Sequence, residues 1–203
     1  MKAVRIDHHG GPEALQIVTV PEPSIGPGLV TVEVSHVGLN RLDVWVRRGV
    51  DSHTFPLPLI PGSDVVGVRT DTGERVALHP GFGCETCPTC ASGRHDLCRR
   101  YAIRGETIDG GMCERVVVPE SHLLPCSLPP EQAAGLPLSL LTAWHMLVGR
   151  AGVKPGETVL IQAGGSGVGS LAIQIAKLHG ATVAVTASTE AKRKRCLDLG
   201  ADH

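Results

Sequence analysis

The sequence predicts a two-part chain in which a strand-rich, partly open β-barrel precedes the beginning of a doubly wound parallel α/β sheet. Three patterns carry this prediction. Hydrophobic and polar residues alternate from Leu29 to Ser35, which is the period of a half-buried strand. Further short apolar stretches before residue 120 lie between turns rich in glycine and proline, which is typical of a small barrel. From Thr158 to Gly169, an apolar strand, a glycine-rich turn and the start of a helix follow one another.

Composition limits the classes of protein to consider. The 203 residues suffice for two domains with sizeable cores, and a hydrophobic content of 42% is typical of a globular protein. A formal net charge of -1 argues against a general binder of nucleic acids or anionic membranes. The amino terminus does not resemble a signal peptide, and no apolar run approaches the ~20 residues of a membrane span. We therefore expect a cytoplasmic protein with no membrane or nucleic-acid partner.

Turn signals and hydrophobic periodicity place the individual elements. Strands are predicted over 2–6, 15–20, 62–68, 75–78, 116–119, 158–161 and 181–186, in addition to the one that begins at Leu29. Helices are predicted near 42–48, from 129, over 136–148, after the glycine turn and over 189–199, the first of them stopped by Gly49 and the last by Gly200. The strand-rich half therefore comes first, and the strand-turn-helix unit follows it.

Four cysteines form a cluster with the spacing of a metal site. Cys84, Cys87, Cys90 and Cys98 are separated by two, two and seven residues. Four thiolates at such spacings can converge on one ion, and four sulfur ligands with no open position describe a structural tetrahedral zinc. The alternative is buried or disulfide-paired cysteines, but these short spacings do not suit disulfide geometry for all four. The remaining three cysteines, Cys113, Cys126 and Cys196, are expected to be small buried hydrophobes.

The glycine-rich turn predicts a dinucleotide site. A helix that begins after such a turn points its first backbone N–H groups and the positive end of its dipole at the crevice, where they favour a pyrophosphate. The fingerprint has serine at its middle glycine position, and an adjacent glycine supplies the extra backbone clearance. The residues expected to contact the cofactor here are Gly164, Ser166, Gly167, Val168 and Gly169. The alternative is a tight turn with no ligand.

Charge at the end of the second strand of this unit favours NADP(H) over NAD(H). An NAD-selective site places Asp or Glu there, whereas Thr186, Ala187 and Ser188 offer no acid. Ser188 can donate to a 2′-phosphate, and Lys192 or Arg193 can pair with it. The alternative is that the basic run belongs to a solvated helix face, and NAD(H) remains the alternative cofactor.

Taken together, several motifs resemble one family. They are the cysteine spacing, Gly38-Leu-Asn-Arg-Leu-Asp43, Pro61-Gly-Ser-Asp-Val-Val-Gly67, Leu138-Ser-Leu-Leu-Thr-Ala-Trp144 and Ala163-Gly-Gly-Ser-Gly-Val-Gly169. The chain resembles, from Met1 to His203, the zinc-type medium-chain dehydrogenase/reductase superfamily, which includes alcohol dehydrogenases and quinone oxidoreductases. The resemblance implies a GroES-like domain over 1–127 with a structural-zinc lobe at about 80–100, a Rossmann domain over 128–203, and an active site in the cleft between the two domains.

The sequence departs from the zinc alcohol dehydrogenases at the catalytic metal. The resemblance implies a cysteine ligand where Asn40 stands and a His-Glu pair where Ser63 and Asp64 stand. An amide and a hydroxyl do not replace thiolate and imidazole as zinc ligands, and Leu138, near the position of a third ligand, is apolar. We therefore expect one structural zinc and no catalytic zinc, as in the branch that reduces quinones or activated alkenes.

The resemblance implies hydride transfer between a nicotinamide and a quinone, enone or alcohol/carbonyl substrate. Asn40 is the expected donor to the developing oxyanion, Asp43 is expected to orient Asn40 or Arg41, and Thr142 is expected to contact the nicotinamide. Each has a structural alternative, since Asn40 and Asp43 can cap a helix and Thr142 can pack between helices.

The chain contains only the first two strands of a sheet that normally has about six. We therefore expect a chain truncated within the Rossmann domain, completed by another chain or prone to self-association. Two functions compete: an NADP(H)-dependent oxidoreductase, and a non-catalytic zinc-stabilised remnant or interaction module. A zinc-knuckle nucleic-acid binder is disfavoured, because the chain has only two Trp, one Tyr and two Phe.

Overall fold

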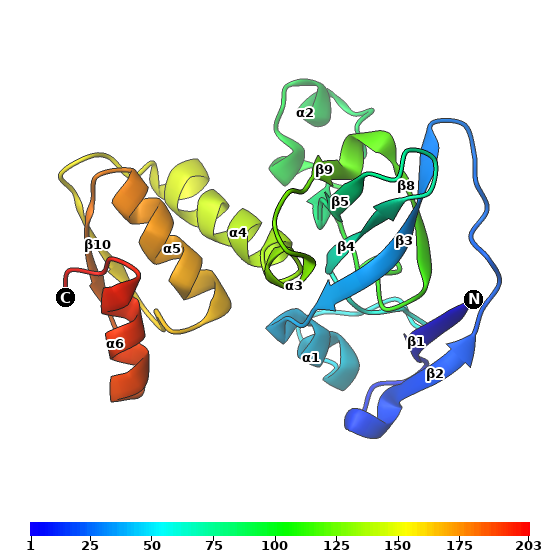
Figure 1. Ribbon diagram of the computed structural model, residues 1–203, viewed down its shortest axis with the longest axis horizontal. Helices are drawn as coiled ribbons and strands as arrows, with labels where there is room; N and C mark the ends of the chain where they lie inside the picture. Colours follow the sequence, from blue (N-terminus) through cyan, green and yellow to red (C-terminus); the bar gives the residue numbers. More distant parts are fainter. The chain divides into compact units, whose positions relative to one another are not determined.

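A computed structural model describes all residues from Met1 to His203 and divides them into two compact units, 1–138 and 139–203. The first unit is built on a curled five-stranded antiparallel sheet with the strand order β8-β3-β4-β5-β9 (Figure 1). This sheet confirms the predicted partly open barrel. The domain boundary expected at 127/128 stays a prediction.

The strands of the first unit lie close to their predicted positions. They are β1 (Lys2–Ile6), β2 (Leu15–Thr19), β3 (Leu29–Gly38), β4 (Asp64–Arg69), β5 (Arg75–Leu78), β6 (Gly81–Phe82), β7 (Ala102–Ile103), β8 (Arg115–Pro119) and β9 (Leu123–Pro125). β1 pairs with β2, and β6 pairs with β7, as separate antiparallel ladders. The two-residue strands and β9 have no counterpart in the prediction, because they are too short to show a period.

One face of the curled sheet forms the core of the first unit. The side chains that gather there are Val32, Val65, Val76, Leu78, Val116 and Val118. They come from four neighbouring strands at alternate positions, as a half-buried antiparallel sheet requires. A separate cluster of Ile6, Val46, Phe55 and Leu59 packs β1 against the helix α1 (Arg41–Arg48).

Short helices complete the first unit and lead into the second. They are α2 (Pro88–Ala91), α3 (Pro130–Ala133) and α4 (Pro137–Trp144), with 3-10 turns η1 (Pro12–Ala14), η2 (His95–Leu97) and η3 (Glu120–His122). The predicted helix over 136–148 is wrong in one respect: beyond Trp144 it continues as a π-helix, η4 (His145–Ala151). The wider turn contains Gly149, which lacks the β-carbon that would lie 3.0 Å from Nδ1 of His145.

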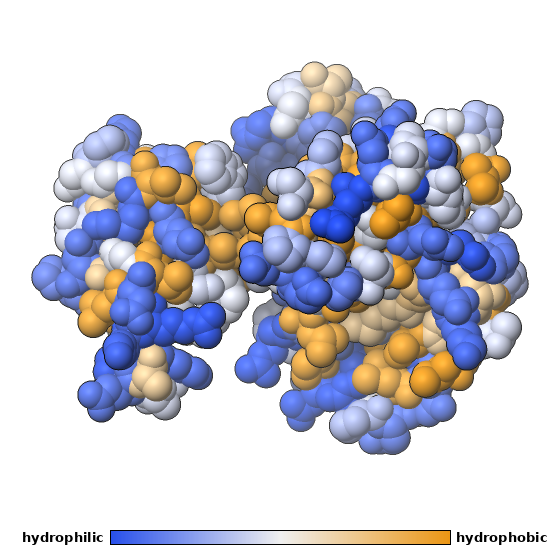
Figure 2. Space-filling view, in the orientation of Figure 1, coloured by the Kyte–Doolittle hydropathy of each residue, from blue (hydrophilic) through white to orange (hydrophobic).

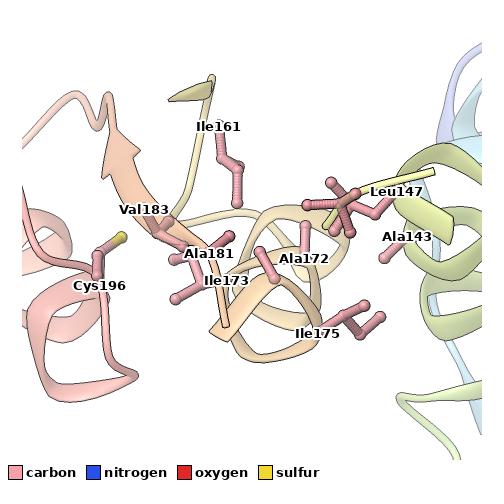
Figure 3. Packing of buried hydrophobic residues seen from close by; sticks show 12 residues of the cluster. Ala143, Leu147, Ile161, Ala172, Ile173, Ile175, Ala181, Val183 and Cys196 are labelled. Carbon is pink, nitrogen blue, oxygen red and sulfur yellow. The ribbon is translucent and has the colours of Figure 1, made fainter. Parts of the chain in front are cut away.

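The second unit is a β-α-β arrangement followed by one more helix. β10 (Thr158–Ile161) and β11 (Thr182–Val185) pair in parallel, and α5 (Gly167–Leu178) connects them. Figure 3 shows Ile161, Ala172, Ile173 and Val183 gathered between these strands and α5. Cys196 reaches the same cluster from α6 (Glu190–Asp198) and is fully buried, as expected of a small hydrophobe.

The surface mixes polar and apolar residues. In the face shown in Figure 2, hydrophilic residues lie beside several groups of hydrophobic residues. No helix combines the length and the hydropathy that a bilayer crossing needs.

Candidate functional site

The four clustered cysteines converge in the structure. Their Sγ atoms all lie within 4.8 Å of one another, with 3.6 Å between Cys87 and Cys90 and 3.8 Å between Cys87 and Cys98. A tetrahedral zinc with Zn–S bonds of about 2.3 Å places its sulfurs about 3.8 Å apart. Cys84 and Cys90 lie 4.0 Å apart, close to the same edge length. The residues therefore fit a four-sulfur zinc site with no open position.

Local backbone geometry shapes the cysteine loop. Cys87 precedes α2, where its Sγ accepts the N–H of Cys90 at 3.5 Å. The Sγ of Cys98 accepts the N–H groups of Cys84 and Arg100 at 3.4 and 3.3 Å. Such N–H donors stabilise thiolate charge. The Sγ of Cys84 also accepts from the guanidinium of Arg100 at 3.1 Å, a charged partner that the cysteine spacing could not reveal.

A buried cation connects the cysteine loop to the barrel. The side chain of Arg104 is 5% exposed, its guanidinium lies 5.1 Å from the ring centre of Phe82, and its Nη2 lies 3.1 Å from Nδ1 of His122. The Nε2 of His122 lies 3.3 Å from Oε1 of Glu85, which stands between two of the cysteines. Burial lowers the pKa of Arg104 to about 10. Glu85 thus lies beside the imidazole of His122, whose other ring nitrogen faces the buried guanidinium. No local pattern in the sequence indicates this arrangement, because its residues come from separate segments.

Asn40 and Asp43 begin the helix α1, as their structural alternative expects. Asn40 is the N-cap residue, and Oδ2 of Asp43 accepts the main-chain N–H of Asn40 at 2.7 Å, which is one half of a capping box. The Oδ1 of Asp43 accepts the N–H of Gly62 at 3.0 Å. Burial raises the pKa of Asp43. The carboxylate of Asp43 therefore holds the backbone of Asn40, and the backbone of Asp43 with the side chain of Asn40 forms the other half of the capping box.

The side chain of Asn40 is held by Asp64 at the start of β4. Nδ2 of Asn40 donates to Oδ2 of Asp64 at 2.9 Å, while Oδ1 of Asp64 accepts the N–H of Leu138 at 2.5 Å. Asp64 is 1% exposed. The preceding residue, Ser63, is fully buried and donates from its hydroxyl to the carbonyl of Arg104 at 2.6 Å. Asp64 is not among the predicted site residues, because its contact with Asn40 joins two distant segments.

The buried carboxyl of Asp64 makes stability depend on pH. Burial raises its pKa from 3.8 to about 6 against the opposing effect of its hydrogen bonds. The unfolded chain therefore releases this proton at lower pH than the folded chain, so stability is greatest below pH 4 and is lost as the pH rises through 6. The contribution is about 3 kcal/mol.

Comparison with Asp64→Asn tests this dependence. Urea denaturation gives the unfolding free energy of each protein. The value for the wild type minus the value for the variant should fall by about 3 kcal/mol between pH 4 and pH 7. Asp43 is present in both proteins, so its own titration largely cancels in the difference. If the unfolding free energies of the wild type and the variant changed with pH in parallel, the expected effect of burying Asp64 would be contradicted.

In the second unit, the glycine-rich turn lies open at the carboxyl ends of the two parallel strands. Ser166 caps α5 by accepting the N–H of Gly169 on its hydroxyl at 3.0 Å. A β-carbon on Gly169 would lie 2.4 Å from the carbonyl oxygen of Ala163, so only glycine fits there. Gly164 is buried against Cys196 and Val185, and a β-carbon on it would lie 3.0 Å from the sulfur. The turn is not packed into the interior.

A pocket of about 550 Å³ adjoins this turn. Its lining residues are Gln162, Ala163, Gly165, Ser166, Thr186, Ala187, Ser188 and Lys192. The structure thus brings three of the predicted cofactor residues, Ser166, Ser188 and Lys192, to one pocket. The lining contains no carboxylate, and the side chain of Lys192 lies across Gly165 with three carbons within 3.2 Å of the position that a β-carbon would take.

The other predicted cofactor residues do not line this pocket. Val168 packs against the core of the second unit, and Gly167 lies beside Ser139, which is 6% exposed. Arg193 donates to the carbonyl of Ala187 at 3.3 Å. Thr142 is half-buried on α4. Helix periodicity could have separated Lys192 from Arg193, because consecutive helical residues point about 100° apart.

The fold and the two sites define the class of protein. The chain has a curled barrel with a four-cysteine loop, and a β-α-β unit with a glycine-rich turn follows in the sequence. This is the architecture of a zinc-binding dehydrogenase. Residues 26–130 match the family described as alcohol dehydrogenase GroES-like domain, and residues 167–203 match that described as zinc-binding dehydrogenase. The chain belongs to the zinc-type medium-chain dehydrogenase/reductase superfamily.

Individual relatives agree with this assignment. Human quinone oxidoreductase is 32% identical over 99% of this chain and 57% of its own length. A crystal structure of an NAD-dependent alcohol dehydrogenase has 46% identity and a TM-score of 0.93, covering 100% of this chain and 62% of that one. The quinone oxidoreductase of Thermus thermophilus, solved alone and with NADPH, has 36% identity and a TM-score of 0.78, covering 100% and 58%. The chain thus spans about three fifths of these relatives.

Proposed function

We propose that the chain forms part of an NADP(H)-dependent oxidoreductase that transfers a hydride to or from a quinone, enone or alcohol/carbonyl substrate. The observation that carries the proposal is the open glycine-rich turn, which lies beside a pocket at the ends of β10 and β11 and leads directly into the capped helix α5. Membership of a dehydrogenase superfamily supports it. Bound NADPH supplies the hydride.

The pocket lining favours NADP(H). Ser188 and Lys192 offer a hydroxyl and an ammonium to a 2′-phosphate, and no carboxylate is present to accept ribose hydroxyls. The relative solved with NADPH supports this choice, whereas the relative named NAD-dependent supports NAD(H) as the alternative. We propose that Gly164, Ser166, Gly167, Val168 and Gly169 form the turn around the pyrophosphate, with Arg193 and Thr142 as further contacts.

Lys192→Ala tests the choice of cofactor. Removing the ammonium should raise the Kd for NADPH about tenfold and change the Kd for NADH little, because only NADPH carries the 2′-phosphate. Nicotinamide fluorescence titration measures both constants. Lys194→Ala, an exposed lysine of the same helix outside the pocket, is the matched control. Equal losses for NADPH and NADH would contradict the role of Lys192.

We further propose one structural zinc on Cys84, Cys87, Cys90 and Cys98 and no catalytic zinc. The donor chemistry of Asn40 and Ser63 supports the second part, since both are neutral oxygen and nitrogen groups engaged in hydrogen bonds. In this proposal Asn40 donates from its amide to the substrate oxygen as negative charge develops there, and Asp43 fixes its backbone. The cysteine usage supports a reducing, cytoplasmic location.

Direct binding distinguishes this proposal from a non-catalytic remnant or interaction module. We expect NADPH to bind the 203-residue chain below millimolar concentration, with nicotinamide fluorescence as the measurement. Failure to bind would favour the non-catalytic alternative. The partners that we propose are a small-molecule substrate and a second chain, either another copy or a completing one.

A further inference from the structure

The carboxylate of Asp64 accepts hydrogen bonds from two N–H groups in distant parts of the first unit. One oxygen faces Nδ2 of Asn40 at 2.9 Å and the other faces the backbone N–H of Leu138 at 2.5 Å. The residue is 1% exposed, so bulk water does not compete for either oxygen. A buried carboxylate is costly unless it is hydrogen-bonded, and here both oxygens are used.

Two separate contacts therefore fix Asn40. Its main-chain N–H is bound by Asp43 from within the helix α1, and its side-chain amide is bound by Asp64 from β4. The amide nitrogen carries two N–H donors, and Asp64 takes one of them. The second donor and the carbonyl oxygen of the amide then have a set orientation relative to the barrel.

The charge of Asp64 decides which end of the Asn40 amide it binds. An ionised carboxylate only accepts, so it selects the NH₂ end. A protonated carboxyl can donate as well as accept, so it also allows the carbonyl end of the amide, with the amide turned over. Burial raises the pKa of Asp64 to about 6, the nearby Asp43 carboxylate adds to this rise, and the hydrogen bonds from Asn40 and Leu138 oppose it.

We propose that Asp64 is a positioning residue that orients the side-chain amide of Asn40 and thereby sets which hydrogen-bonding group Asn40 presents to the substrate. This inference rests on the proposed function, in which Asn40 contacts the substrate oxygen. Asparagine at position 64 offers only one accepting oxygen, and its NH₂ group would face one of the two N–H donors. Asp64→Asn is therefore the informative variant.

The first experiment needs no turnover. In the ¹⁵N-labelled wild-type chain, the side-chain NH₂ signals of Asn40 should shift with pH and show a midpoint near 6. In Asp64→Asn this titration should be absent, and in Asp51→Asn, which changes an exposed carboxylate, it should be unchanged. Signals of Asn40 that do not move with pH in the wild-type chain would overturn the inference even if Asp64→Asn failed to fold.

The second experiment measures NADPH oxidation with 1,4-benzoquinone and with 2-hexenal between pH 5 and 8. We expect Asp64→Asn to lower kcat about tenfold or more, to leave the Kd for NADPH unchanged and to lose the wild-type pH dependence near 6. Wild-type values in Asp64→Asn would overturn the inference alone. A wild-type chain that titrates but oxidises NADPH with neither compound would overturn the proposed function and support the orientation of Asn40 by Asp64.

Discussion

Replacing Cys98 with serine is expected to reduce the zinc content of the purified chain from one ion per molecule to almost none. The Sγ of Cys98 lies 3.8 Å from that of Cys87 and accepts two backbone N–H groups, so it is central to the cluster. A hydroxyl is a poor substitute for a thiolate ligand. Because metal binding to such a site also stabilises the fold around it, the unfolding free energy of the first unit should fall by about 4 kcal/mol or more.

Metal analysis and urea denaturation measure these effects. Cys126→Ser is the matched control, because Cys126 does not belong to the cluster: it packs against Val66, Ala77, Ala133 and Ala134, and its Sγ lies 4.0 Å from the carbonyl of Leu128. Retention of a full equivalent of zinc by Cys98→Ser would refute the four-sulfur site. Two zinc ions per wild-type chain would refute the expectation that Asn40 and Ser63 hold no catalytic metal.

Replacing Gly169 with alanine should be the most damaging single change in the second unit. Its new methyl group would lie 2.4 Å from the carbonyl oxygen of Ala163 and 2.8 Å from Cα of Gly164, and both are backbone atoms that cannot rotate away. The turn must open to admit it. We expect a loss of about 3 kcal/mol in unfolding free energy and a rise of tenfold or more in the Kd for NADPH.

Gly167→Ala is the matched control within the same turn for the stability measurement. Its methyl group would meet only the hydroxyl of Ser139, at 3.1 Å, and alanine favours the helix that begins there. Stability should therefore change little. If both variants bound NADPH as the wild type does, the close backbone approach at Gly169 would have no part in cofactor binding.

Local signals were sufficient to predict most elements, the convergence of the four cysteines and the glycine-rich turn before α5. The cysteine spacing and the glycine turn each lie within one short stretch of sequence, so pattern alone brings their residues together. The strands of the barrel likewise follow from alternation, as at Val30, Val32 and Val34 in β3. The curled sheet and the β-α-β unit confirm the predicted fold class.

Contacts between distant segments could not be read in this way. Asn40 and Asp64 are 24 residues apart, and nothing near either residue in sequence indicates that one amide and one carboxylate will meet. Arg104 has the local appearance of a solvated charge, yet it lies beside Phe82 and His122 in the interior. Such partners are set by strand order and register, which a periodicity does not specify.

The conformation of Glu85 has a consequence for both parts of the first unit. This residue has a φ of 60°, in the left-handed region that non-glycine residues seldom adopt, and the loop formed by its cysteine neighbours holds it there. Its carboxylate lies 3.3 Å from Nε2 of His122, and Nδ1 of the same imidazole lies 3.1 Å from the guanidinium of Arg104. A change that moves the cysteine loop would therefore also move the carboxylate beside His122, so the loop and the barrel interior are connected by this one row of polar side chains.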